Sequence, residues 1–187
     1  IANLTILSCQ AKNIIGYKIY LEGGFLKEEG EMVSPKGTLI EVRDIFFNTP
    51  ARRKFLQNDS IELKKIIDVV TRYALLHNMI SYKIVHEKTV LLQTTVTNEK
   101  FQTIVAIYGP EVARRMIPIN FENEYIKMEG YISKPELTRQ EKSYQSFFVN
   151  KRYIKSNVIT QALYSAYHSL LFVGQHPLAI LDIEINL

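Results

Sequence analysis

Three cationic side chains follow a sharp turn signal in the first third of the chain. The turn signal is Asn48-Thr49-Pro50, and the cations are Arg52, Arg53 and Lys54. Because proline lacks a backbone donor and has a fixed φ, a strand must end there and a helix can begin. Guanidinium groups at a strand-to-helix junction suit phosphate or carboxylate oxygens. The residues therefore predict an anion contact, with an internal ion pair to Asp44 or Asp68 as an equally weighted alternative.

A second cationic group, Lys151, Arg152 and Lys155, lies between an aromatic strand-like stretch and a helix that Ser156 or Asn157 is expected to cap. The free amides at the start of such a helix also favour anions. Plain solvation of a turn is the alternative for Lys151 and Arg152. No segment resembles a recognition helix for base edges, so any DNA contact is expected to reach the backbone, independent of base sequence.

The positive charge of the chain is concentrated in these two places. The net charge is +4. Residues 50–72 carry six cations and three anions, and residues 139–155 carry five cations and one anion. A solvated face is the usual interpretation of a charge run, and two focused basic blocks on an otherwise balanced chain give a polyanion partner equal weight.

Other chemistry lacks its signatures. The four histidines show no zinc-ligand spacing, Gly23-Gly24 is not part of a phosphate-binding loop, and the carboxylates form no convincing pair. We therefore expect no catalytic residue and no metal site. The single cysteine, Cys9, is interpreted as a buried thiol in a reducing, cytoplasmic compartment. No apolar run approaches the roughly 18 residues of a membrane span.

The elements that position these residues fall into two parts. Strands are expected at residues 1–8, 16–22 and 38–44, with a polar loop at 27–36. Three strands without helices would leave one sheet face uncovered. From residue 51 the pattern is that of an α/β unit with one sheet and helices mainly on one face. Helices are expected near 59–77, 98–108 and 156–171; strands near 82–86, 90–94, 116–121, 125–133, 144–150 and 178–185; and a mobile loop at 134–143.

The run from Gly37 to Leu56, GTLIEVRDIFFNTPARRKFL, closely resembles the segment in DNA mismatch repair MutL proteins that leaves the ATPase domain. Phe148-Val149-Asn150 with Arg152 resembles a second signature of that family. The resemblance implies an α+β / α/β fold. Residues 1–50 would be the last strands of an incomplete antiparallel ATPase sheet of the GHKL type. Residues 51–187 would be the transducer domain, a ribosomal-protein-S-five-domain-two-like β-α-β sandwich with a left-handed crossover.

The resemblance also implies a function. Proteins of this family use ATP and Mg²⁺, and Gly37 and Thr38 would form part of the nucleotide-site wall, although a structural turn explains Gly37 equally well. The family's catalytic glutamate and Mg²⁺-binding asparagine would precede Ile1, and its phosphate-binding lysine would follow Asn186, so this chain alone is expected to be monomeric and without ATPase activity.

A positive groove in the family binds single- or double-stranded DNA, which implies DNA contacts for both basic blocks. Implied partners of the whole protein are a second copy, a MutS-type mismatch recognition protein and a repair endonuclease or helicase, near the nucleoid. Two alternatives remain: the corresponding region of another GHKL machine, such as a type II topoisomerase or a chaperone, and an RNA- or ribosome-binding module.

Overall fold

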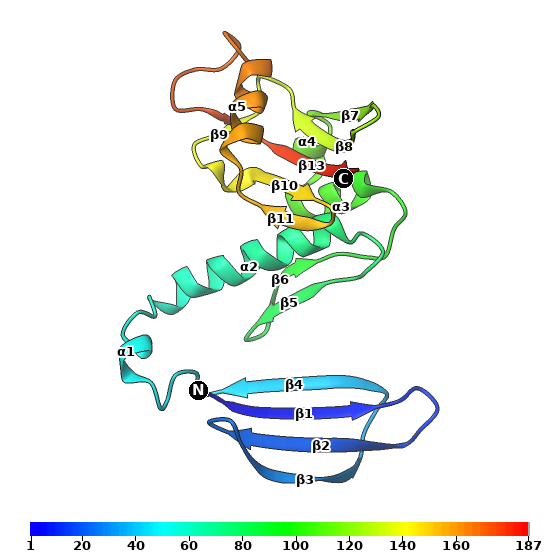
Figure 1. Ribbon diagram of the computed structural model, residues 1–187, viewed down its shortest axis with the longest axis vertical. Helices are drawn as coiled ribbons and strands as arrows, with labels where there is room; N and C mark the ends of the chain where they lie inside the picture. The colour runs from blue at the N-terminus through cyan, green and yellow to red at the C-terminus, as the bar shows by residue number, and fades with distance from the viewer. Residues whose placement is uncertain (187) are drawn as a thin grey trace. The chain divides into compact units, whose positions relative to one another are not determined.

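The computed structural model describes residues 1–186 and divides the chain into two compact units, Ile1–Glu62 and a second that begins at Leu63 (Figure 1). The first unit is a four-stranded antiparallel sheet in the order β3-β2-β1-β4. Its strands are β1 (Asn3–Cys9), β2 (Ile15–Glu22), β3 (Phe25–Val33) and β4 (Gly37–Arg43). The prediction of a polar loop at residues 27–36 is wrong, because β3 pairs with β2 along its whole length. Lys18 Nζ of β2 forms an ion pair with Glu28 Oε1 of β3 at 2.8 Å.

The two faces of this sheet differ in polarity. Alternate side chains of a strand point to the same face of the sheet. Leu4 and Ile6 of β1 therefore share one face with their apolar partners in β2 and β4, which include Ile40 and Val42. Several of these side chains are strongly exposed, Ile40 at 61% and Val42 at 54% among them. Residues 1–62 thus place no helical layer over this face, as the sequence pattern predicts. Cys9 is buried, and its Sγ lies 3.3 Å from the carbonyl oxygen of Asn13, which confirms a structural thiol.

The second unit is built on a five-stranded mixed sheet in the order β11-β10-β13-β8-β7. Strands β10 and β13 are parallel and the other neighbours are antiparallel. The connection from β10 to β13 passes through β11 and α5; its handedness stays a prediction. The strands of the sheet are β7 (Met116–Glu122), β8 (Ile126–Ser133), β10 (Gln145–Val149), β11 (Arg152–Ile154) and β13 (Ala179–Ile185).

Helices and short ribbons complete this unit. A hairpin joins β5 (Lys83–His86) to β6 (Thr89–Gln93), as predicted. The expected mobile loop at 134–143 instead contains β9 (Thr138–Arg139), which pairs with β12 (His176–Pro177), and leads into the 3₁₀ turn η1 (Lys142–Tyr144). The α-helices are α2 (Asp59–Leu76), α3 (Lys100–Tyr108), α4 (Pro110–Ala113) and α5 (Asn157–Ala166).

The sheet carries a hydrophobic core on each face. Leu75 of α2, Ile104 of α3 and Ala113 of α4 pack with Phe148 and Ile180 on one face. On the other face, Leu163 and Tyr167, in and just after α5, pack with residues of β10 and β13. The prediction of helices mainly on one face is correct for α2, α3 and α4, and α5 adds a layer on the opposite face.

The helix ends show which local signals decide the structure. The cap of α2 is Asn58 rather than the predicted Asp59: its Oδ1 accepts from the Ile61 amide at 3.0 Å, and the Glu62 carboxylate accepts from the Gln57 amide at 3.1 Å. At α5 the predicted cap is confirmed, because Ser156 Oγ accepts from the amide of Ile159.

The buried face of α2 differs from the expected one. Ala74, Leu75 and Leu76 are buried, whereas Ile66 and Tyr73 are 54% and 56% exposed. Only the C-terminal end of this helix therefore enters the core of the second unit.

Candidate nucleic-acid interface

The turn between β10 and β11 presents the second basic block. Val149 pairs with Arg152, which leaves the two-residue loop Asn150-Lys151, and both loop residues have positive φ, 47° and 63°. A two-residue hairpin loop of this conformation matches the twist of the flanking strands, and asparagine suits its first position. The local sequence therefore fixes a tight turn, and Arg152 is the first residue of β11.

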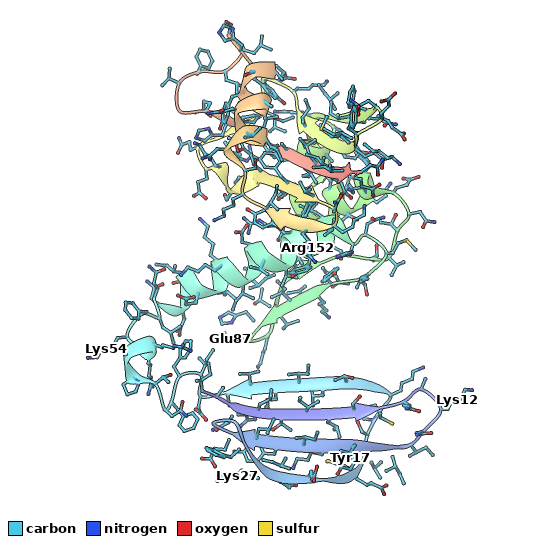
Figure 2. The ribbon with its side chains drawn as sticks, in the orientation of Figure 1. Lys12, Tyr17, Lys27, Lys54, Glu87 and Arg152 are labelled. Atoms are coloured by element: carbon cyan, nitrogen blue, oxygen red, sulfur yellow. The ribbon has the colours of Figure 1, made fainter. Side chains whose placement is uncertain are left out.

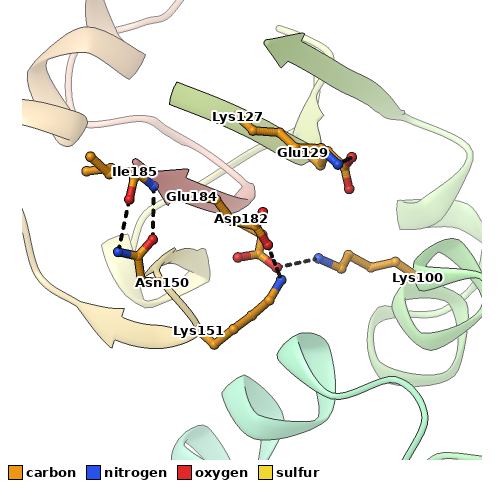
Figure 3. A network of polar contacts seen from close by, with 8 residues as sticks. All are labelled: Lys100, Lys127, Glu129, Asn150, Lys151, Asp182, Glu184 and Ile185. Carbon is orange, nitrogen blue, oxygen red and sulfur yellow. Dashed lines mark hydrogen bonds and ion pairs between the residues drawn. The ribbon is translucent and has the colours of Figure 1, made fainter. Parts of the chain in front are cut away.

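Asn150 anchors this turn to the end of β13. Its Oδ1 accepts from the Ile185 amide at 2.9 Å, and its Nδ2 donates to the Ile185 carbonyl at 3.4 Å (Figure 3). Its own backbone amide donates to the Ile183 carbonyl. The side chain thus continues the strand pairing where the main chain of β10 ends. The asparagine of the Phe148-Val149-Asn150 signature has a structural role here.

Lys151 points toward the same strand and forms ion pairs there. Its Nζ lies 2.7 Å from Asp182 Oδ2 and 3.1 Å from Glu184 Oε1 (Figure 3). The hydrogen bond to Asp182 is the main cause that raises the pKa of the Lys151 ammonium. Plain turn solvation is therefore wrong for Lys151. Its charge is already offset by two carboxylates, so it is a poorer phosphate ligand than its neighbour Arg152.

Asp182 is shared by a second ammonium. The Lys100 Nζ lies 3.7 Å from Asp182 Oδ2, and the side chains of Lys100 and Asp182 are 19% and 9% exposed. Burial lowers the pKa of Lys100, and the nearby Asp182 opposes that shift. The largely buried Asp182 carboxylate thus links β13 to α3 through Lys100 and to the β10–β11 turn through Lys151.

Arg152 and Lys155 are exposed and border two adjoining pockets (Figure 2 labels Arg152). Arg152 lines a pocket between α2 and the β10–β11 hairpin, and Lys155 lines a second one at the start of α5, each of about 380 Å³. Arg72 and Tyr153 line both pockets. Their side chains are stacked, with the guanidinium carbon 4.3 Å from the ring centroid.

The second pocket gathers positive charge around the first turn of α5. Lys142, Lys155 and Arg72 line it together with Ser156, the cap residue of the helix. Asp68 also lines it, and its Oδ2 lies 2.6 Å from Arg72 Nη2. The exposed ammonium groups of Lys142 and Lys155 and the helix amides thus form a concave basic site, which can accept phosphate oxygens without reading bases.

The first basic block lies in the other compact unit. Arg52 and Arg53 belong to the single-turn helix α1 (Pro50–Arg53), Lys54 is its C-cap, and all three are exposed. Helix initiation at Pro50 is confirmed. Within the first unit, Asp44 accepts a hydrogen bond from Asn3 Nδ2 at 2.9 Å. Within the second unit, Asp68 pairs with Arg72. The three cations remain candidates for an anion partner.

Gly37 and Thr38 begin β4 opposite the end of β1. Gly37 has a φ of 119°, a conformation that side chains rarely adopt, and Thr38 Oγ1 lies 2.9 Å from Ser8 Oγ. The backbone geometry alone accounts for glycine at this position. A role in a nucleotide-site wall stays a prediction.

Sequence reasoning missed two members of the basic site. Lys142 lay in a segment expected to be a mobile loop, and Arg72 lay inside a helix whose buried face was placed differently. Both were visible as members of the basic blocks, because Lys142 falls within residues 139–155 and Arg72 within residues 50–72. Their convergence depends on the packing of α2 against the sheet, which no local pattern encodes.

Within residues 1–186, no cluster of three or more histidine, cysteine, aspartate or glutamate side chains could hold a metal ion. No helix in that range combines the length and the apolar character that crossing a membrane requires.

The family described as "DNA mismatch repair protein, C-terminal domain" matches residues 104–187. The chain is 39% identical over 171 residues to the DNA mismatch repair protein MutL of Halalkalibacterium halodurans, covering 91% of this chain and 27% of that protein. It is 36% identical over 186 residues to MutL of Streptococcus thermophilus, covering 100% and 29%. The chain thus spans less than a third of the length of these curated relatives.

Solved structures agree on the fold. The Aquifex aeolicus MutL ATPase domain complexed with ADP aligns with a TM-score of 0.78 at 22% identity, covering 100% of this chain and 68% of that one. The B subunit of DNA gyrase from Myxococcus xanthus aligns with a TM-score of 0.54 at 13% identity, covering 99% and 57%. The gyrase likeness concerns the fold alone, whereas the MutL relatives are similar in sequence along nearly the whole chain. This chain belongs to the MutL family of DNA mismatch repair proteins.

Proposed function

We propose that this chain is the part of a MutL-type mismatch repair ATPase that binds the DNA backbone and transmits the nucleotide state of the ATPase to that contact. The observation that supports it best is a set of three exposed cations around two adjoining pockets: Lys155 and Lys142 line the pocket at the start of α5, and Arg152 lines the pocket beside α2. Three exposed charges around adjoining concave sites suit consecutive phosphates of a strand.

The proposal assigns residues 1–50 to the end of the ATPase domain and residues 51–187 to the transducer domain. The whole protein would bind ATP with Mg²⁺, in keeping with the ADP complex of the Aquifex relative. It would act in the bacterial cytoplasm, near the nucleoid, as a homodimer, together with a MutS-type mismatch recognition protein and a repair endonuclease or helicase. This chain alone would be monomeric and would not hydrolyse ATP.

The test is a fluorescence-anisotropy titration of the chain with a labelled DNA duplex at two salt concentrations, about 50 and about 200 mM, which differ about fourfold. Each phosphate contact contributes a slope of about −0.9 to the logarithm of affinity against that of salt. Three contacts therefore predict a loss of about 40-fold over this range. The double substitution Lys142→Ala with Lys155→Ala should leave one contact and a loss of only about fourfold.

A matched control is Lys83→Ala with Lys88→Ala, which removes two exposed lysines from the β5–β6 hairpin. This control should keep the steep salt dependence of the unaltered chain. Absence of duplex binding at 50 mM salt would contradict the proposal. Tighter binding to duplex RNA than to DNA would favour an RNA-binding module instead.

A further inference from the structure

Lys151 lies where a DNA contact could be made, but its charge is engaged elsewhere. It lines the pocket of about 380 Å³ between α2 and the β10–β11 hairpin together with the exposed Arg152, and its own side chain is 55% exposed. Its ammonium group nevertheless lies against β13, 2.7 Å from Asp182 Oδ2 and 3.1 Å from Glu184 Oε1 (Figure 3). Two adjacent cations of one hairpin thus differ in how available their charge is to an anion.

The two contacts of Lys151 differ in strength. Asp182 is 9% exposed, so its contact with Lys151 is largely shielded from water. Glu184 is 48% exposed, and a pair that exposed contributes little. Lys100 Nζ also lies 3.7 Å from Asp182 Oδ2 and is 19% exposed, so a second cation stays beside this carboxylate if Lys151 moves away. Asp182 therefore holds Lys151 in place without depending on it as its sole counter-charge.

The charged cluster around this contact is neutral as it stands. Its members are three ammonium groups and three carboxylates: Lys100, Lys127, Lys151, Glu129, Asp182 and Glu184 (Figure 3). Lys127 pairs with Glu129 at 2.9 Å, both on β8. The exposed fractions of the three lysines are 19% for Lys100, 43% for Lys127 and 55% for Lys151. If the carboxylates of β13 were neutral, Lys151 would therefore be the ammonium group best placed to reach a ligand.

We propose that Lys151 is a fourth phosphate ligand of this surface, which Asp182 and Glu184 hold away from DNA. Three phosphate contacts are made while Lys151 is paired with β13, and a fourth is made once it is released. The two carboxylates of β13, which do not line either basic pocket, thus limit how tightly the chain binds the DNA backbone. The inference rests on the proposed DNA binding and adds the residues that set its strength.

The test is the salt dependence of duplex binding, measured by fluorescence anisotropy on a variant that combines Asp182→Asn with Glu184→Gln. At about −0.9 per phosphate contact, release of Lys151 should steepen the slope from about −2.7 to about −3.6. The loss of affinity between about 50 and about 200 mM salt should then rise from about 40-fold to about 150-fold. If the pair served only to hold the turn, the slope would stay the same or become shallower, because a loosened turn adds no phosphate contact.

Lys151→Ala in the same background identifies the group responsible. This triple variant should return to a slope near −2.7, since the released ammonium group is gone. If the carboxylates acted by repelling DNA directly, the steeper slope would persist without Lys151. Glu124→Gln removes an exposed carboxylate from the turn between β7 and β8, and it should leave the slope of the unaltered chain unchanged.

A second releasing variant protects the test against loss of the fold. Lys100→Met with Asp182→Leu removes the buried pair as a whole, which avoids an unpaired buried charge. It leaves Lys151 beside the exposed Glu184 and should also steepen the slope beyond −2.7, so it replaces the first variant if circular dichroism shows that one to be unfolded. A folded releasing variant with a slope near −2.7 would overturn the inference, while the proposed backbone binding would stand. If the unaltered chain binds no duplex at about 50 mM salt, both are wrong.

Discussion

Asp182 provides the sharpest test of how the β10–β11 turn is held. Its carboxylate is 9% exposed and pairs with Lys151, which is 55% exposed, and with Lys100, which is 19% exposed. Removal of one partner from a fully buried pair costs about 3–5 kcal/mol, whereas an exposed pair contributes about 0–1 kcal/mol. Since one cation here is mostly buried and the other half exposed, we expect Asp182→Asn to lower the free energy of unfolding of the second unit by about 2–3 kcal/mol.

Glu184→Gln is the matched comparison on the same strand. Glu184 is 48% exposed, and among residues 1–186 its ion pair is with Lys151, at 3.1 Å. Its removal should cost about 0.5 kcal/mol or less, because the charge that remains is solvated and still bound to Asp182.

Amide hydrogen exchange of β13 is the appropriate assay, because it reports on the second unit alone. A loss of about 2 kcal/mol corresponds to roughly 30-fold faster exchange of the most protected amides. The reasoning would be refuted if Asp182→Asn and Glu184→Gln had equal effects, or if Asp182→Asn slowed exchange.

Three further changes test the packing of the second unit by urea unfolding. Gly130→Ala should destabilise it by about 3 kcal/mol, because a Cβ at this position would lie 2.0 Å from the Ile180 carbonyl oxygen; an unchanged urea midpoint would show that β8 can move away from β13. Ser156→Ala should cost about 1 kcal/mol by removing the cap of α5, and a neutral result would mean that the bond to the Ile159 amide contributes nothing. Burial raises the pKa of Tyr108 to about 12, so the folded state retains this proton at pH values where the unfolded chain loses it, and stability falls as the pH rises above about 10. Tyr108→Phe should reduce that fall by about 1 kcal/mol between pH 9 and 11; equal losses in both proteins would contradict the buried position.

Local signals predicted the elements that depend on nearby residues. Ser156 starts α5 because its hydroxyl oxygen accepts a hydrogen bond from the free amide of Ile159, three residues ahead. This cap depends on neighbouring residues alone, so the local sequence predicts it. Pro50 starts α1 for the same kind of reason. The hairpin at Asn150 and Lys151 was not predicted: a direct strand-to-helix turn was expected there, whereas the structure adds the short strand β11 after a two-residue loop with positive φ.

Partners distant in the chain could not be found in this way. The middle of strand β3 is polar, and its pairing with β2 is what makes it a strand. Lys151 and Asp182 are 31 residues apart, and nothing near Lys151 indicates that a carboxylate of β13 will reach it. The basic site is a further case, because Arg72 of α2 meets Lys155 only once the helix has packed against the sheet.

The most direct test of the account is the salt dependence of duplex binding after single substitutions at neighbouring positions of one turn. Arg152 is exposed and free to contact phosphate, whereas Lys151 is held by Asp182. Arg152→Ala should therefore change the slope of affinity against salt from about −2.7 to about −1.8, while Lys151→Ala should leave it near −2.7. A slope reduced by Lys151→Ala and unchanged by Arg152→Ala would contradict the assignment of the DNA contact.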